Sequence, residues 1–138
     1  HDTEDGPMTV AVAHQVSPTS RQALVQAVQE ARFRGTDLAV LHVVDSIDAD
    51  REEAYRLGVS DEIDKVVRSE AGVPWRLHLA TADADLAGAL LRLVGTLDAD
   101  LLVIGARRRS PVGKALLGSV AQTVILEANL PVLVVKAT

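Results

Sequence analysis

The chain of 138 residues has the length of one domain, and its hydrophobic content of 48% is enough to bury a core. Its net charge of -5 and its aromatic content of 2% argue against a nucleic-acid binder, because cationic surface and stacking rings are both scarce. The absence of cysteine excludes a disulfide scaffold and thiolate chemistry, and no apolar run approaches the roughly 20 residues of a membrane helix. We expect a cytoplasmic protein that binds neither nucleic acid nor membrane.

Strand patterns alternate with helical patterns along the chain. We expect residues 1–7 to form a disordered lead-in to one domain over residues 8–138. The strand patterns fall at about 8–14, 37–44, 73–80, 100–105 and 131–136. This alternation predicts an α/β fold, a doubly wound five-stranded parallel sheet with crossover helices on both faces.

The first two helical patterns differ in clarity. The first begins at Pro18 and ends at Gly35, as proline at a helix start and glycine after a helix end indicate. The second, around residues 50–71, is acidic and irregular. Gly58 predicts a break in it, and Ser60 predicts the start of a second piece.

The last two helical patterns are more regular. The third covers about residues 83–97, with Thr81 or Asp83 as its N-cap. The fourth covers about 119–128. Its predicted inward face consists of Val120, Val124 and Ile125.

Residues 105–119 are the most informative stretch, because they join a buried strand to a helix start through a basic loop. Gly105 ends the apolar strand, and Ser119 with Gln122 forms a capping-box pattern at the helix start. The loop carries four cations and no acid: Arg107, Arg108, Arg109 and Lys114. In an acidic chain this inversion of charge favours a bound anion of phosphate size, which the remaining free amides of the helix start would hold.

The spacing Gly105-x2-Arg108-x9-Gly118-Ser119 resembles the Gly-x2-Gly-x9-Gly-Ser/Thr nucleotide signature of the universal stress protein family, with Arg108 replacing the middle glycine. Segments 9–13, 38–45, 98–105 and 129–136 also resemble that family, in its order. The resemblance implies a stress-response protein with strand order 3-2-1-4-5. In such sheets the ligand lies where the order reverses, here between the first and fourth strands.

The resemblance further implies an adenine nucleotide in this crevice, ATP or AMP, with Mg²⁺ accompanying ATP. The implied nucleotide-binding residues are Ala11, Ala13, Val43, Gly105, Arg108, Gly118, Ser119 and Val120. The phosphates would meet backbone amides of the loop and the helix start, and adenine would meet the backbone of Val43. Arg108 has two open roles, because its guanidinium could grip phosphate while its bulk could crowd it.

The first strand lacks the acidic residue that nucleotide-binding members of this family carry near the adenosine. Ala13 cannot accept a hydrogen bond through its side chain, so His14 or Gln15 would have to substitute. A lone histidine after a strand is more often a structural residue than a ligand contact. The site could therefore bind nucleotide weakly, or the chain could be an interaction module of the same fold that binds none.

Enzymatic chemistry finds no support in the residues. No P-loop, dinucleotide fingerprint or metal-ligand spacing is present, and no nucleophile with a base can be assembled. We expect no catalysis, although slow ATP hydrolysis remains a third alternative. Residues 131–136 are apolar on both faces and fall at the implied sheet edge, so we expect a homodimer joined through them.

Overall fold

The computed structural model describes residues 9–15, 18–106, 108–109 and 115–136. Its main sheet has five parallel strands in the order β3-β2-β1-β4-β7. They are β1 (Thr9–His14), β2 (Leu38–Val44), β3 (Trp75–Thr81), β4 (Ala99–Gly105) and β7 (Val132–Val135). The predicted α/β class and strand order are confirmed, and the largest shift of a strand start is that of β3, which begins at Trp75.

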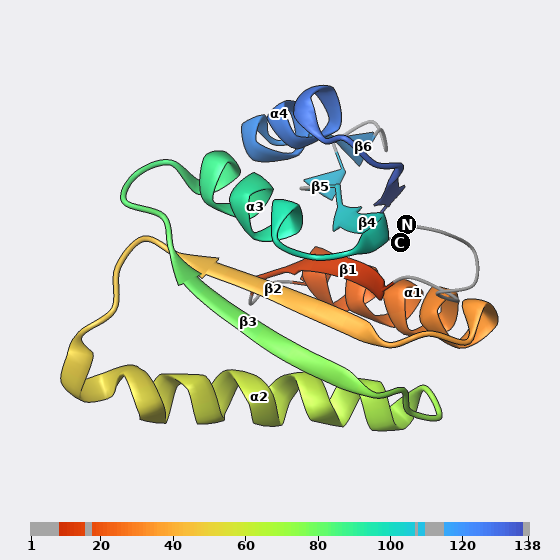
Figure 1. Cartoon of the computed structure of the whole chain (residues 1–138), viewed down its shortest axis with the longest axis horizontal. Helices are drawn as coiled ribbons and strands as arrows, with labels where there is room; N and C mark the ends of the chain where they lie inside the picture. Colours follow the sequence, from red (N-terminus) through yellow and green to blue (C-terminus); the bar gives the residue numbers. More distant parts are fainter. Residues whose placement is uncertain (1–8, 16–17, 107, 110–114, 137–138) are drawn as a thin grey trace.

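Helices cover the sheet on both faces (Figure 1). One face carries α1 (Pro18–Arg34) and α2 (Glu52–Ser69), and the other carries α3 (Leu86–Gly95) and α4 (Ser119–Glu127). Alternate residues of each strand serve alternate faces. Val10 and Val12 therefore pack under α1 and α2, whereas Ala11 and Ala13 face α3 and α4.

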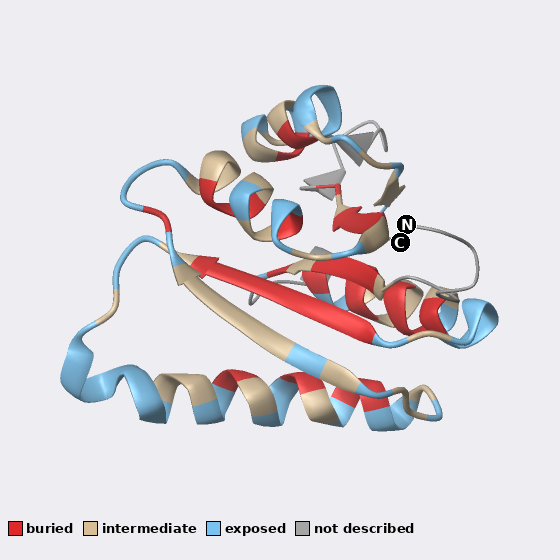
Figure 2. Ribbon diagram, viewed as in Figure 1, coloured by how far each residue is buried: buried red, intermediate tan, exposed pale blue. Residues whose placement is uncertain are grey.

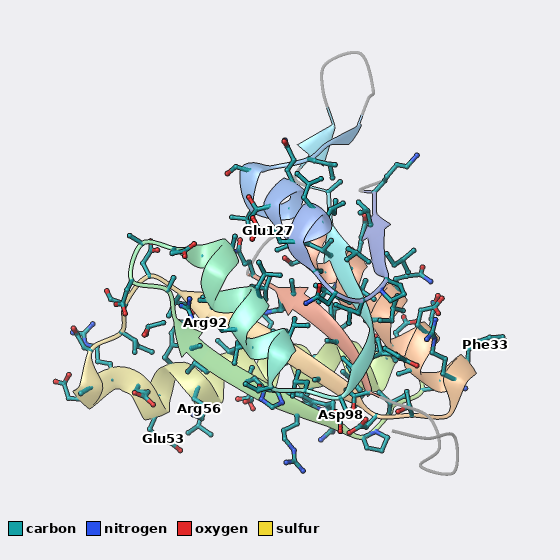
Figure 3. All side chains as sticks on the ribbon, turned by 45° about the horizontal axis from the view of Figure 1, so that its top comes forward. Phe33, Glu53, Arg56, Arg92, Asp98 and Glu127 are labelled. Carbon is teal, nitrogen blue, oxygen red and sulfur yellow. The ribbon has the colours of Figure 1, made fainter. Side chains whose placement is uncertain are left out.

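The central strands are the most deeply buried part of the molecule. Residues 38–43 of β2 are all buried, because this strand lies between two others and beneath helices on both sides (Figure 2). Every residue of the edge strand β7 is half-buried. Phe33 is a contrast at the far end of α1, where its ring is 89% exposed (Figure 3).

Helix α1 matches its prediction, but the predicted break in the second helix is wrong. Gly35 follows α1 with φ of 67°, a conformation that glycine adopts without cost. A 3-10 turn over Ala49–Arg51 leads into α2, which continues through Gly58 as one helix. Glycine costs about 1 kcal/mol inside a helix. Burial of the apolar face of α2 outweighs that cost; this face consists of Val59, Ile63, Val66 and Val67.

The predicted cap of the third helix is also wrong. The N-cap of α3 is Asp85, whose side chain accepts a hydrogen bond of 3.0 Å from the amide of Gly88. Asp83 and Ala84 precede it with φ of 49° and 70°. Two residues in the left-handed region turn the chain after β3, and the helix can begin only beyond them.

The fourth helix begins at the predicted residue but without the predicted capping box. Gly118 is the N-cap, and Ser119 is already helical. Gln122 donates its side-chain amide to the carbonyl of Leu117 instead of reaching the cap, at 3.0 Å. The inward face also differs, since Ala121 is buried beside Val124, whereas Ile125 is 36% exposed. Ala121 and Val124 are three residues apart, so they share the face of α4 that lies against the sheet.

The connection from β4 to α4 contains a short antiparallel hairpin that the sequence did not predict. Its strands are β5 (Arg108–Arg109) and β6 (Ala115–Leu116), with Arg108 opposite Leu116. Over the described part of the chain, no helix combines the length and apolarity that crossing a bilayer requires.

Candidate functional site

The candidate site lies at the carboxyl ends of β1 and β4, where the strand order reverses. β1 pairs with β2 on one side and with β4 on the other. The chain leaves β1 toward α1 on one face and leaves β4 toward α4 on the opposite face. The two connections diverge, and a crevice at the strand ends is the expected result in a doubly wound sheet.

Gly105 and Ala106 hold the start of the loop after β4 against the end of β7. Gly105 is the last residue of β4 and pairs with Val135. The next amide, of Ala106, donates to the carbonyl of Val135 at 2.8 Å, and Ala106 is buried. Arg108 and Arg109 follow in the hairpin. Arg107 and Lys114 lie outside the described residues, so the four-cation cluster stays a prediction.

The amino terminus of α4 has the composition of an anion site. Gly118 has φ of -71° and ψ of 167° and forms no side-chain cap. Ser119 is exposed, so this helix start is accessible. The positive end of the helix dipole and the first-turn amides favour negative charge there. Any residue can adopt this φ, so the value of glycine at 118 would be the close approach it permits.

The predicted contacts on β1 and β2 lie on the same face of the sheet as α4. Ala11, Ala13 and Val43 all belong to the cluster beneath α3 and α4. Ala11 and Val43 are buried, whereas Ala13, nearer the strand end, is half-buried. β2 and β4 are two strand spacings apart, about 10 Å, a gap that a nucleotide in extended form can bridge.

His14 points to the opposite face of the sheet. Its Nδ1 atom lies 3.0 Å from Nδ1 of His42 on β2, and both side chains are buried. The imidazole of His14 therefore cannot substitute for the missing acid beside the adenosine. Gln15 can still substitute for that acid, since its side chain is exposed just beyond β1. Its backbone amide donates to Ser20 Oγ at 2.9 Å.

Comparison with known proteins assigns the family. The model of the universal stress protein family matches residues 7–136. The chain belongs to the universal stress protein family. A universal stress protein of Mycolicibacterium smegmatis is 39% identical over 132 residues, which span 92% of this chain and 96% of that protein.

Solved structures agree with this assignment. A universal stress protein from Archaeoglobus fulgidus superimposes with a TM-score of 0.72 at 30% identity, over 92% of this chain and 97% of its own. A structure of the universal stress protein from the same organism in complex with dAMP gives a TM-score of 0.73 at 27% identity, over 92% and 96% of the two chains. The family and the fold that the resemblance implied are both confirmed.

Sequence reasoning missed the histidine pair in this universal stress protein. His14 and His42 are register partners on adjacent strands, and each continues the strand positions that face α1 and α2. That shared alternation was visible in the sequence, but the pairing depends on the register of β1 against β2. A third partner, Tyr55 on α2, has its hydroxyl 2.8 Å from Nε2 of His42.

Burial holds both imidazoles of the pair neutral at physiological pH. Burial, and then the neighbouring His42, lower the pKa of His14 to about 4. Burial also lowers the pKa of His42, although a hydrogen bond to the backbone of His14 and the carboxylate of Glu62 act in the opposite direction. A neutral pair needs one donor and one acceptor at the Nδ1 contact, and the two rings provide both.

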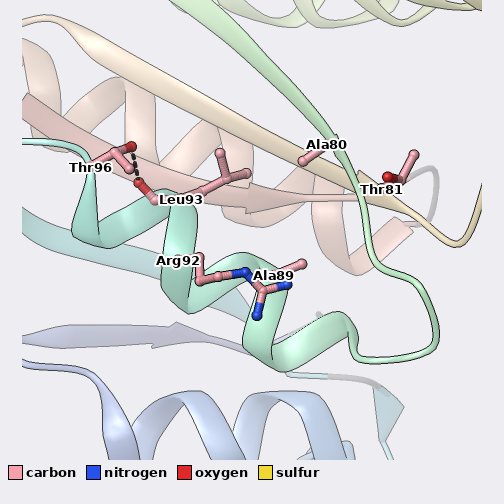
Figure 4. Close-up of a pocket in the computed structure, with 6 residues that line it drawn as sticks. All are labelled: Ala80, Thr81, Ala89, Arg92, Leu93 and Thr96. Atoms are coloured by element: carbon pink, nitrogen blue, oxygen red, sulfur yellow. Dashed lines mark hydrogen bonds between the residues drawn. The ribbon is translucent and has the colours of Figure 1, made fainter.

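A recess of about 170 Å³ lies one strand outside Val43 (Figure 4). Its lining residues come from the end of β3 and from α3 and its C-cap: Ala80, Thr81, Ala89, Arg92, Leu93 and Thr96. Ala80 is the register partner of Val43, so the recess adjoins the predicted adenine position on the same face. It does not reach β4 or α4, and by itself it would not hold phosphate. Within the described residues, no group of three or more candidate side chains could hold a metal ion.

Proposed function

We propose that this universal stress protein is a cytoplasmic stress-response module that binds an adenine nucleotide, ATP or AMP, or another phosphate anion, without catalysing a reaction. The observation that carries the proposal is the amino terminus of α4, whose N-cap, Gly118, supplies no side-chain hydrogen bond to the first-turn amides. It lies at the end of the connection from Gly105. The similar protein from Archaeoglobus fulgidus, described in complex with dAMP, supports an adenine nucleotide as the ligand.

The proposed roles follow from position. The phosphates lie at the loop and at the first turn of α4, where the amides of Ser119 and Val120 can donate and the helix dipole favours negative charge. Adenine lies toward β2, beside the backbone of Val43. Arg108 adds positive charge from the hairpin, and Mg²⁺ accompanies ATP through the phosphates.

Affinity should be modest because no carboxylate lies at the end of β1. The ribose hydroxyls lose a charged acceptor, a contact worth about 1.5–3 kcal/mol. We propose that recognition depends mainly on the phosphates, and that ATP therefore binds more tightly than adenosine.

Calorimetry and thermal unfolding with ATP, AMP, cyclic AMP and adenosine test the proposal. A nucleotide at 100 times its dissociation constant should stabilise the protein by about 2.7 kcal/mol. Gly118→Val should abolish that effect by placing a branched side chain where the phosphates approach. Gly95→Ala is the matched control, since a Cβ there has no atom within 4 Å. Equal affinity for wild type and Gly118→Val would contradict the proposed site.

Arg108 needs two variants because its two roles predict opposite results. If its guanidinium grips phosphate, Arg108→Ala weakens ATP far more than adenosine. If it crowds the site, Arg108→Gly tightens ATP. Equal affinities in the wild type and both variants would exclude both roles.

An interaction module is the second candidate, and exposed apolar residues near the sheet edge favour it. Leu126 on α4 is 83% exposed, and β7 pairs only with β4 in the described sheet.

We propose a homodimer through residues 131–136, in which the free edge of β7 pairs with its copy. Light scattering should give twice the chain mass, and Val134→Lys should shift the protein toward monomer. A monomeric wild type at micromolar concentration would rule this out.

A further inference from the structure

Three hydrogen-bonded side chains link β1 through β2 to α2. The Nδ1 atoms of His14 and His42 are 3.0 Å apart, and Nε2 of His42 is 2.8 Å from the hydroxyl of Tyr55. The two imidazoles are 5% and 2% exposed. Their ring centroids are 5.1 Å apart, and the centroid of Tyr55 is 5.8 Å from that of His42. The nucleotide site proposed above lies on the opposite face of the sheet and involves none of these three side chains.

The hydrogen bonds of His14, His42 and Tyr55 tolerate one added proton but not two. With both rings neutral, either tautomer satisfies both hydrogen bonds, because the tyrosine hydroxyl can donate or accept. One added proton is also accommodated: His42 then donates from both nitrogens, and Nδ1 of His14 still accepts. A second proton places N–H groups on both Nδ1 atoms with no acceptor between them. It also places two cations in contact in the core. Water must reach them to offset the cost of burying two like charges, and it enters when Tyr55, which is bonded to His42, moves away from the pair.

Tyr55 is the main anchor of the first two turns of α2. The start of α2 is mostly exposed (Figure 2): within residues 49–58, only Tyr55 and Arg56 are half-buried. Arg56 pairs with Glu52 of its own helix at 3.6 Å. The buried residues of α2 begin only at Val59. Gly58, just before it, weakens the helix at the boundary between the two parts.

We propose that His14, His42 and Tyr55 form an acid-sensitive latch, which fastens residues 49–58 to the sheet at neutral pH and releases them when the histidine pair takes up a second proton. Residues 59–69 stay docked through their apolar face. Acid thus loosens the segment that follows β2 while the rest of the sheet and its helices remain folded.

The surroundings of the pair determine where the first proton goes. From α2, the carboxylate of Glu62 favours the charged form of His42. From α1, the uncharged Ser20 lies beside the end of β1. From β3, the register partner of His42 is the apolar Leu79. The first proton therefore goes to His42, and the second would have to go to His14.

The pH dependence of latch opening follows from the pKa of His14, the second imidazole to be protonated. Burial and the neighbouring imidazole lower the pKa of His14 from 6.5 to about 4, and release returns it toward 6.5. Because the latched pKa is the lower one, the latch is complete above about pH 6.5 and is lost as the pH falls toward 4. Full release of His14 would raise the opening equilibrium about 30-fold between pH 7.5 and pH 5.

Hydrogen exchange read by mass spectrometry tests the latch, with intrinsic rates corrected for pH. Protection of residues 52–58 should fall by up to about 30-fold between pH 7.5 and pH 5, while residues 59–69 keep theirs. The chain has one tyrosine and one tryptophan, so Tyr55 absorbance reports the latch. Trp75 fluorescence reports the docked half of α2, because its Nε1 donates to Asp64 at 3.2 Å.

Two variants and one control distinguish a latch from a merely structural pair. His14→Leu leaves one imidazole, which can bond Tyr55 in either charge state, so protection of residues 52–58 should no longer depend on pH. Tyr55→Phe should leave them poorly protected at both pH values. His78→Gln is the control, because the pKa of His78 is also lowered, by burial and then by Arg76, on the other face. Protection that survives at pH 5, or that falls equally in His14→Leu, would overturn the proposal.

Discussion

The two faces of the sheet differ most at the carboxyl ends of β1 and β2. Toward α1 and α2 the side chains near these ends include His14 and His42, which are buried and bonded to each other. Toward α3 and α4 they are Ala13 and Val43, which hold no polar group. The same two strands therefore close one face with a polar contact and leave small apolar groups on the other. Alternation along a strand lets adjacent residues serve unrelated purposes.

The largest expected effect concerns the core beneath α2. Ile63→Ala removes a fully buried side chain from the α1–α2 face and should lower the free energy of unfolding by about 3–4 kcal/mol, through lost burial and a cavity. Leu126→Ala on α4 is the control, since that side chain is 83% exposed and its loss should cost less than about 0.5 kcal/mol. Urea unfolding measures both. A similar loss in the two variants would contradict the burial described for the two helices.

Acid should affect the histidine face next. The pKa of His14 is lowered to about 4, so the unfolded state binds more protons and stability falls from about pH 6.5 toward pH 4. This group alone should account for roughly 3 kcal/mol at pH 4, as an upper bound. The difference between wild type and His14→Leu, in urea unfolding at pH 7.5 and 4, isolates it from the titrating carboxylates. A constant difference would mean that His14 is not buried as a neutral ring.

A carboxylate introduced at the end of β1 should strengthen nucleotide binding on the face toward α3 and α4. Ala13→Asp supplies an acceptor for ribose hydroxyls and should tighten ATP and AMP by about tenfold, the value of one hydrogen bond to a charged group. Gln15→Asp is the parallel variant, since its side chain is exposed beyond the strand. Calorimetry decides which position lies beside the ligand. If both variants weaken binding, the ribose does not lie at the end of β1.

The smallest effect compares the two helix starts on the α3–α4 face. Asp85→Ala removes the side chain that caps α3 and should cost about 1 kcal/mol. Ser119→Ala should change stability by less than about 0.5 kcal/mol, because Ser119 is helical and exposed rather than a cap. Thermal unfolding compares them. A larger loss for Ser119→Ala would restore the capping box that the sequence predicted.

Predictions of elements were accurate where the signal was local and strong. The apolar runs of β2 and β4 and the proline and glycine around α1 predicted their elements closely. Errors arose where a local rule met a tertiary one. Gly58 reads as a breaker, yet burial of the following face keeps α2 continuous. Asp83 reads as a cap, yet its φ of 49° makes it part of the turn, and the cap falls on Asp85.

The candidate site divides in the same way. The loop and helix start at Gly105 and Gly118 were visible because glycine spacing is a property of the chain alone. The opposite orientation of Ala13 and His14, and the contact of His14 with His42, could not be read with the same certainty. They depend on which strand positions face which pair of helices and on the parallel register of β1 with β2.

The periodicity of the sequence by itself determined the α/β class. Its resemblance to the universal stress proteins implied the family and the order of the strands, and the spacing of Gly105 and Gly118 predicted where a phosphate-sized loop would lie. Only the tertiary structure decided the continuity of α2, the cap of α3 and the bonded pair of His14 with His42. Each of these depends on groups that the fold alone brings together: a buried helix face, a turn in the left-handed region, and two imidazoles that are 28 residues apart in the chain and 3.0 Å apart in space.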